Sequence, residues 1–384
     1  LKKKTLLVNG SIYKEGDWLT INGTEGYIYG QKLNLVTSNF MTNKYFQKLM
    51  VMTNKFKKLK VRSNADNPND ALLAKKLGAQ GIGLCRTEHM FFDKKRIRSM
   101  QKMILSNNLI NRKKAIMDLL PYQEKDFYNI LKVMSPLPVT IRLLDPPLHE
   151  FLPSQKNTLL IKSLAENMGM TSKQIQNRII DLFEINPMLG HRGCRLAISF
   201  PEITEMQVTA ILSAAARLIK EGKKPKPEIM IPLISSVGEF NHQKKIVQEI
   251  AKKIDFKYNI KIKYSLGTMI ELPRACLTAD KIAESADFFS FGTNDLTQTT
   301  FGFSRDDIGS FIQNYFDNNI LSEDPFKTLD VNGVGKLVEM ATKKGRQVNK
   351  KIKIGICGEH GGDPKSVYFF DDIGLDYVSC SPYR

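Results

Sequence analysis

The sequence predicts an α/β protein whose main domain is a (β/α)8 TIM barrel, preceded by a short β-rich segment. Eight short apolar runs alternate with helical segments, which is the pattern of βαβ units around a parallel sheet. Polar residues with catalytic potential follow the ends of these runs, as they do in barrel enzymes. The first 35 residues instead carry the turn signals of β-hairpins.

Size and composition agree with this fold class. The chain has 384 residues, enough for one large domain and something smaller, and its 42% hydrophobic content is that of a globular protein. No apolar run reaches the roughly 18 residues of a membrane-spanning helix. The opening segment LKKKTLLVNGSIY lacks the apolar core and cleavage site of a signal peptide, and the five cysteines include no C-x-x-C pair. We therefore expect a cytoplasmic protein without a membrane partner, and leave an organelle open.

The net charge of +18 raises the question of an anionic partner. The basic residues are mostly lysines spread along presumed helices, as in 244–263. No arginine-rich block and no basic stripe interleaved with aromatic residues is present, so we expect no nucleic-acid partner. A solvated lysine-rich surface with a modest attraction for anionic substrates is the better interpretation.

The amino-terminal segment, residues 1–35, is predicted to form short strands joined by tight turns. The dipeptides Asn9-Gly10 and Asn22-Gly23 are hairpin signals. These few strands cannot bury a core of their own, so they resemble the tail of a β-rich domain. A helical linker is expected over 36–58, where apolar residues recur at helical spacing.

The predicted barrel covers residues 59–384, with its largest insertion at 146–226, between the third and fourth strands. The segment 191–199 has charges at helical spacing and is interpreted as helix rather than as a ninth strand. The eight expected strands lie within 59–66, 81–88, 138–145, 228–234, 265–271, 288–295, 353–359 and 376–382.

An open, doubly wound sheet is the alternative, and the positions of the polar residues favour the barrel. The carboxyl ends of barrel strands converge on one face, where the active sites of such enzymes lie. No G-x-G-x-x-G or G-x-x-x-x-G-K-[ST] loop is present, so this chain is not expected to bind a nucleotide. Five residues with chemical potential lie at or just after predicted strand ends: Arg86, Arg142, Glu271, Asp295 and Cys357.

Two of these residues, Glu271 and Asp295, are predicted to bind a divalent metal ion. They end neighbouring strands and have no adjacent histidine or cysteine pair, which suits Mg²⁺ or Mn²⁺. The alternative is that either acid caps the helix that follows, and DLTQTT after Asn294 does read as a helix start.

The two arginines at strand ends, Arg86 and Arg142, are predicted to bind an anionic ligand. A buried guanidinium without a partner is costly, and its planar fork matches phosphate or carboxylate. The alternative is structural ion pairing with Glu88 or Asp145. Three further arginines are candidates for the same cage: Arg192, Arg195 and Arg305.

The turn formed by Gly292, Thr293 and Asn294 leads into a predicted helix. Backbone N–H groups at such a position form an anion site suited to a substrate carboxylate.

Cys357 is predicted to transfer a proton, because it lies at a strand end within the glycine-rich segment GICGEHGG. An ordinary thiol pKa of about 8.5 suits proton exchange with carbon. A nucleophilic role would need a paired histidine, and His360 is close enough in sequence to keep that alternative open. The cysteines expected to serve only as packing are Cys85, Cys194 and Cys276.

With these residues identified, the chain resembles the phosphoenolpyruvate (PEP) or pyruvate-binding portion of the PEP-utilising enzymes. The stretch LDPPLHEF points to the dikinase branch of that family, whereas PEP synthase and phosphotransferase-system enzyme I share only the R-T-E, G-T-N-D and C-G-E elements. The segments that carry the resemblance are GIGLCRTEHMFF, RLLDPPLHEFLP, NPMLGHRGCRL, PEIMIPLI, GTMIELPRA, FFSFGTNDLTQTTFGFSRDD, GICGEHGGDP and YVSCSP.

The resemblance implies a role for each of these positions. Cys357 matches the proton donor, and Glu271 and Asp295 match the Mg²⁺ ligands. The parent enzyme would interconvert ATP, phosphate and pyruvate with AMP, pyrophosphate and PEP, and would be a homodimer. The positions that match substrate-binding residues are Arg86, Arg142, Gly292, Thr293 and Asn294.

Two departures from the family pattern suggest a fragment. The phosphohistidine motif and the ATP-binding domain are absent, and the sequence stops before the family's closing helix. Residues 1–35 resemble the end of the phosphohistidine domain, which would be a partner within the same parent chain. A standalone PEP mutase or lyase-like barrel is the alternative enzyme, but it has no reason to keep such a tail. A non-catalytic basic binding protein would leave the acids and the cysteine at the strand ends unexplained.

Overall fold

The computed structural model describes residues 5–23, 25–35, 43–106, 108–184 and 186–384, and it divides into two compact units. The first unit, Leu1–Lys57, contains two antiparallel pairs of strands and one helix. At the Asn9-Gly10 turn both residues have positive φ, 49° and 79°, as the hairpin signal predicts. Within the segment 36–58, residues 36–42 lie outside the described residues. The elements of this unit are β1 (Thr5–Val8), β2 (Ser11–Lys14), β3 (Thr20–Asn22), β4 (Tyr27–Tyr29) and α1 (Lys44–Phe56).

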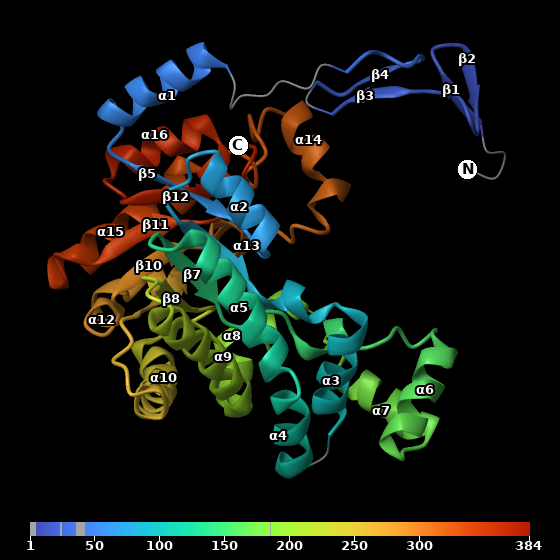
Figure 1. Cartoon of the computed structure of the whole chain (residues 1–384). Helices are drawn as coiled ribbons and strands as arrows, with labels where there is room; N and C mark the ends of the chain where they lie inside the picture. Colours follow the sequence, from blue (N-terminus) through green and yellow to red (C-terminus); the bar gives the residue numbers. More distant parts are fainter. Residues whose placement is uncertain (1–4, 24, 36–42, 107, 185) are drawn as a thin grey trace. The chain divides into compact units, whose positions relative to one another are not determined.

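The second unit, Lys58–Arg384, contains a closed barrel of eight parallel strands, as predicted (Figure 1). The last strand pairs with the first in parallel, which closes the sheet. The strands are β5 (Lys60–Asn64), β6 (Ile82–Arg86), β7 (Pro138–Arg142), β8 (Lys226–Ile231), β9 (Ser265–Ile270), β10 (Phe288–Phe291), β11 (Lys353–Ile356) and β12 (Tyr377–Cys380).

Helices surround the barrel and fill its insertions (Figure 1). The segment 191–199, predicted as helix, contains α8. In the described part of the long insertion between β7 and β8, all regular elements are helices. No helix in the described part of the chain is both long and apolar enough to cross a membrane. The α-helices of the second unit are α2 (Pro68–Lys76), α3 (Lys94–Leu105), α4 (Leu109–Met117), α5 (Leu120–Met134), α6 (Thr158–Met168), α7 (Ser172–Leu182), α8 (Gly193–Ser199), α9 (Pro201–Lys220), α10 (Val237–Tyr258), α11 (Pro273–Leu277), α12 (Ala279–Ala283), α13 (Thr293–Phe301), α14 (Ile312–Asp317), α15 (Lys336–Val348) and α16 (Pro364–Asp372).

Helix α9 packs against both α5 and α10 in the outer layer, and its sequence explains this packing. Fourteen of its twenty residues are buried, including the three consecutive alanines at 214–216. Small side chains let α5 and α10 approach α9 closely from either side. The helix α10 that packs there begins with a capping box between Ser236 and Glu239 and ends at Asn259, in the left-handed conformation.

The interior of the barrel is filled with side chains and is not a channel. Leu84, Met230, Met269, Phe288 and Cys357 form a cluster of their own, separate from the larger core beneath the helices. The Tyr377 ring also occupies the interior, where a Cβ on Gly355 would lie 2.3 Å from it. Glycine on β11 is therefore required for this ring to fit.

A buried ion-pair network closes the amino-terminal end of the barrel. Arg62 donates to Glu228 Oε2 at 2.6 Å and to Thr140 Oγ1 at 3.0 Å, and its guanidinium stacks 4.0 Å from the Tyr377 ring centre. Lys353 pairs with the other Glu228 oxygen at 2.6 Å. Burial by itself would raise the pKa of Glu228, but Arg62 and Lys353 lower it to about 2. The network is fully paired, as buried charges must be.

This network generates a prediction about stability and pH. Replacing the carboxylate in Glu228→Gln leaves Arg62 buried without a counter-charge, so the free energy of unfolding should fall by about 3 kcal/mol at pH 7. Because folding lowers the Glu228 pKa from 4.5 to about 2, its contribution is complete above 4.5 and is lost as the pH falls toward 2. Urea unfolding followed by circular dichroism should therefore show the stabilities of the two proteins converging as the pH falls from about 5 to about 2.

Glu339→Gln is the matched control, because Glu339 pairs with Lys343 on the exposed surface of α15. We expect it to change stability by less than about 0.5 kcal/mol. Equal stability of Glu228→Gln and the unmodified chain at pH 7 would show that the buried network contributes nothing.

Candidate functional site

The carboxyl ends of the barrel strands bring the predicted site residues to one end of the barrel. Arg86 and Arg142 are the last residues of β6 and β7 and lie directly opposite each other in register. Glu271 follows β9 immediately, and Cys357 follows β11. Asp295 lies in the first turn of α13, after β10.

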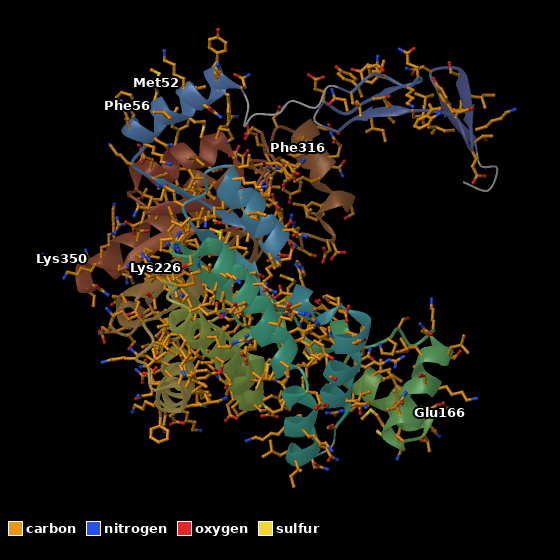
Figure 2. The ribbon with its side chains drawn as sticks, in the orientation of Figure 1. Met52, Phe56, Glu166, Lys226, Phe316 and Lys350 are labelled. Atoms are coloured by element: carbon orange, nitrogen blue, oxygen red, sulfur yellow. The ribbon has the colours of Figure 1, made fainter. Side chains whose placement is uncertain are left out.

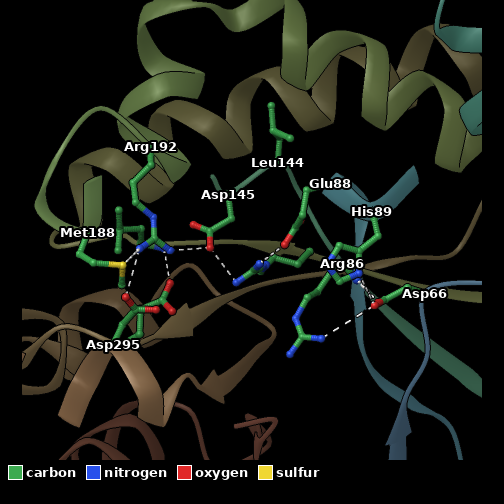
Figure 3. Close-up of polar contacts among 12 residues, drawn as sticks. Asp66, Arg86, Glu88, His89, Leu144, Asp145, Met188, Arg192 and Asp295 are labelled. Atoms are coloured by element: carbon green, nitrogen blue, oxygen red, sulfur yellow. Dashed lines mark hydrogen bonds and ion pairs between the residues drawn. The ribbon is translucent and has the colours of Figure 1, made fainter. Parts of the chain in front are cut away.

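Two buried arginines and three carboxylates form a continuous network at this end (Figure 3). Asp145 Oδ2 pairs with Arg142 Nη1 at 2.8 Å and with Arg192 Nη2 at 2.5 Å. Arg192 also donates to Asp295 Oδ1 at 3.1 Å, and Arg142 donates to Glu88 Oε1 at 2.5 Å. The ion pairs considered as an alternative for Arg142 are thus present, and they hold this guanidinium in a fixed position.

The backbone around Gly193 explains how the helical insertion delivers Arg192 to this network. The Gly193 N–H donates to the Asp145 carbonyl at 2.8 Å. Gly193 has a φ of 56°, and a Cβ at this position would lie 2.7 Å from the Leu233 Cβ. Only glycine allows this close approach, which places the preceding residue, Arg192, against the strand ends.

Glu271 is fully buried, and one of its oxygens has no partner. Its Oε1 accepts the N–H of Leu233 at 2.7 Å, and Leu233 itself has an unusual φ of 59°. Its Oε2 makes no hydrogen bond in the structure. A Cβ on Gly292 would lie 2.5 Å from this oxygen, so the glycine leaves room for it.

The protonation behaviour of the two acids fits a cation site. Burial and the nearby Asp295 raise the pKa of Glu271 well above its ordinary value. Burial also raises the pKa of Asp295, although Arg192 opposes the rise. A divalent cation would offset both effects. No group of three histidine, cysteine or acidic side chains suited to a metal is found among the described residues, so ligand and water oxygens would complete the coordination.

A cavity of about 210 Å³ opens beside this network, and three of the predicted site residues line it. These are Arg86, Asn294 and Cys357. Arg86 is held less firmly than Arg142: its side chain is 36% exposed and lies 3.8 Å from Asp66. Asp66 also accepts the backbone N–H of Arg86 at 2.7 Å and contacts His89 Nδ1 at 2.7 Å (Figure 3). Arg86 therefore presents a guanidinium that is available to an anion in the cavity.

The amino-terminal turn of α13 supplies polar groups next to the same cavity. Its first N–H groups have no partner within the helix. Thr293 Oγ1 and Asn294 Oδ1 are buried and make no hydrogen bond in the structure. Gly358 passes so close that a Cβ there would lie 2.3 Å from Thr293 Oγ1. The Gly292 N–H donates to the Ile270 carbonyl at 3.1 Å, so the polar groups that this turn leaves without a partner are the side-chain oxygens of Thr293 and Asn294, as expected at a ligand-binding turn.

Cys357 is almost completely buried, and burial raises the pKa of its thiol. Its Sγ lies 3.7 Å from the Phe291 carbonyl oxygen, to which it donates. His360 is not paired with it: the His360 ring contacts the Pro325 carbonyl at 3.0 Å, and burial lowers its pKa. The thiol is therefore neutral at pH 7, which suits a proton donor better than a nucleophile.

The other predicted arginines lie outside the network. Arg195 donates to the carbonyls of Leu189 and Gly190. Arg305 is half-exposed and pairs with Glu359, which lines the 210 Å³ cavity, at 3.8 Å. Neither contacts Arg142 or Arg192 in the described structure.

Two residues that organise the site were not among the predicted site residues. Asp145 was considered only as an ion-pair partner, yet it joins the two buried arginines. Asp66 was not considered, yet it holds Arg86. Each is the last residue of a predicted strand segment, 59–66 or 138–145, and that shared position was the signal available in the sequence.

Comparisons with known proteins identify the relatives of this chain. The chain is 52% identical over 382 residues to the chloroplastic pyruvate, phosphate dikinase of Flaveria trinervia, which covers 99% of this chain and 40% of that protein. It is 50% identical over 382 residues to pyruvate, phosphate dikinase of Clostridium symbiosum (99% and 43%). It is 52% identical over 381 residues to that of Giardia intestinalis (99% and 42%). The chain thus spans about two fifths of the length of these relatives.

The family described as PEP-utilising enzyme, PEP-binding domain, matches residues 41–384, which include every predicted site residue. The chain therefore belongs to the PEP-utilising enzyme family, and the part of the family that it contains is the PEP-binding domain.

Proposed function

We propose that this chain forms the PEP and pyruvate half-site of a pyruvate, phosphate dikinase. The complete reaction interconverts ATP, phosphate and pyruvate with AMP, pyrophosphate and PEP. One observation supports the proposal most directly: a guanidinium, an amide and a thiol line one cavity, and Glu271, at the same end of the barrel, has an oxygen without a partner. The relatives reported above are all dikinases, which favours this activity over PEP synthase, enzyme I or a standalone mutase.

Binding of the anionic ligand would rest on Arg86 and on the turn at Gly292–Asn294. Arg86 lines the cavity, and its ion pair with Asp66 is long, at 3.8 Å, so it can pair with a phosphoryl or carboxylate group. The amino-terminal turn of α13 can donate backbone N–H groups to a second anionic group. Arg142 is held by Glu88 and Asp145, so it would contribute positive charge from a fixed position.

Glu271 and Asp295 would hold Mg²⁺ or Mn²⁺. A bound metal ion supplies positive charge that stabilises an enolate oxygen. The unpaired Oε2 of Glu271 and the raised pKa values of both acids are the features that fit this assignment. Arg192 pairs with Asp295 and keeps this carboxylate in position.

Cys357 would transfer the proton at the methyl carbon. In the direction of PEP formation, the Cys357 thiolate takes a methyl proton from pyruvate, and the C–H electron pair becomes the enolate double bond. The enolate oxygen then accepts a phosphoryl group from a phosphohistidine. In the reverse direction the neutral thiol returns the proton to carbon, and burial favours this form. The positive charges of Arg142 and Arg86 oppose the rise in the thiol pKa.

The phosphohistidine would belong to a separate domain of the parent protein, and the parent would be a homodimer. We propose both properties for the parent protein, since this chain spans only about two fifths of the length of its relatives. Sedimentation of the chain would test the dimer directly.

The metal assignment predicts that oxalate, an enolate mimic, binds only with Mg²⁺ or Mn²⁺. Calorimetry should show binding that EDTA abolishes. Glu271→Gln should weaken binding at least about tenfold, because it removes one negative ligand. Glu249→Gln, an exposed acid on α10, serves as the control and should leave binding unchanged. Undiminished oxalate binding in EDTA would contradict the metal assignment.

The proton-transfer assignment predicts that Cys357→Ala and Cys357→Ser lose roughly 10²–10⁴-fold in the exchange of pyruvate methyl protons with solvent. The assay needs the phosphorylated partner domain. Oxalate binding should stay within about twofold, because the arginines and acids are untouched.

Cys276→Ala is the matched control for this experiment, since Cys276 is buried in the core beneath the helices. Its exchange rate should equal that of the unmodified protein. If Cys357→Ala exchanges protons at the normal rate, another residue is the acid–base group, and His360 is the next candidate.

A further inference from the structure

The amino-terminal end of the barrel, opposite the PEP site, opens into a basic cavity of about 1450 Å³. We call this cavity the basic bowl. Lys226 and Lys350, labelled in Figure 2, both line it. Lys60, Lys226 and Lys353 are the first residues of β5, β8 and β11, which fixes its position at the start of the strands. The basic residues that line the bowl are Lys60, Arg62, Lys223, Lys224, Lys226, Lys261, Lys263, Arg346, Lys350, Lys351 and Lys353.

Most of the charge in the basic bowl is not neutralised. Only two carboxylates line it, Glu228 and Asp376. Glu228 pairs with Arg62 and Lys353, and Asp376 pairs with Arg346 at 3.3 Å. The remaining eight lysines are exposed, and none has a carboxylate partner among the described residues. Eleven cations against two carboxylates leave a surplus of nine, half of the net charge of +18.

This concentration of charge differs from the scattered lysines that the sequence suggested. The lysines cluster in three connections that precede strands, at 223–226, 261–263 and 350–353. These connections are separated in sequence, and only closure of the barrel brings them around one cavity. Like charges on concave walls reinforce each other's potential, so the bowl attracts multivalent anions.

The shape and composition of the bowl indicate what kind of anion fits. Its floor is closed by the buried network of Arg62, Glu228 and Tyr377, so a ligand cannot pass into the barrel. Two aromatic residues line it: Tyr377 is buried, and Tyr264 is half-buried. A single-stranded nucleic acid would need exposed rings on which bases stack. Lysine ammonium groups, by contrast, bind phosphate as point charges without a demand for geometry.

We propose that the basic bowl binds a compact polyanion that carries several phosphoryl groups. Free polyphosphate and a nucleoside polyphosphate share this chemistry. The site is independent of the PEP half-site, because it lies at the other end of the barrel and shares none of its residues.

The test is calorimetry of the full 384-residue chain with inorganic tripolyphosphate, at about 50 mM and about 200 mM salt. We expect saturable binding that weakens at least about tenfold at the higher salt, since several charges are neutralised. Lys224→Glu/Lys263→Glu changes two connections of the bowl and should weaken binding at least about tenfold. Lys125→Glu/Lys245→Glu changes the net charge equally on exposed helix faces outside the bowl and should bind like the unmodified chain.

Absence of binding, or equal weakening in the two double variants, would overturn the proposal. ATP should bind no more tightly than tripolyphosphate if phosphates alone are recognised, and tighter ATP binding would assign the bowl to nucleoside polyphosphates. Tighter binding of a single-stranded oligonucleotide, lost in Lys224→Glu/Lys263→Glu, would overturn the choice of a compact ligand. Oxalate with Mg²⁺, measured on the same samples, should bind equally to all three proteins. A failure of oxalate binding therefore reports on the PEP site and not on the bowl.

Discussion

The shared carboxylate of Asp145 is the interaction on which the site depends. Two guanidinium groups buried side by side would repel each other, and one carboxylate between them removes that repulsion. It also joins two parts of the chain: Arg142 belongs to the barrel, whereas Arg192 belongs to the helical insertion. Loss of the Asp145 carboxylate would leave Arg142 with Glu88 and Arg192 with Asp295 as their carboxylate partners in the described site.

The charge balance at this end of the barrel also supports the proposed cation site. Within the described site, Arg142 and Arg192 face four buried or nearly buried carboxylates, at positions 88, 145, 271 and 295. Asp145 and Glu88 each pair with an arginine, whereas Glu271 pairs with neither arginine and accepts one backbone N–H. Burial and the neighbouring carboxylates of Asp295 and Asp145 raise the pKa of Glu271, although Arg192 and Arg142 oppose the rise. Ligand binding and charge neutralisation would then be one event.

The sequence predicted the fold well because short apolar strands, turn residues and helical spacing are local signals. All eight barrel strands and the helix at 191–199 are confirmed by the structure. The residues at strand ends were also identified from the sequence, because a barrel brings the carboxyl ends of its strands together regardless of the conformation of the loops. The partners of each side chain were not predictable, because they depend on contacts between distant segments. Arg305 shows the limit: it was a candidate for the same anion-binding cage as Arg192, but the structure pairs it with Glu359, whereas Arg192 is carried inward by the Gly193 turn. The clustering of lysines around the basic bowl was not predictable from the sequence for the same reason.

The closure of the barrel between β12 and β5 has a consequence for the order in which the site forms. Ser63 Oγ donates to the Cys380 carbonyl, and Ser379 Oγ donates to Asn64 Oδ1, so these contacts join residues more than 300 positions apart. The cavity that holds Arg86 and Cys357 has walls from both ends of this unit. Contacts at such separation form late, because closing a long loop costs entropy before the contact stabilises it. On the ribosome, the ligand cavity is therefore the last part of the unit to assemble, after the helical insertion has already emerged.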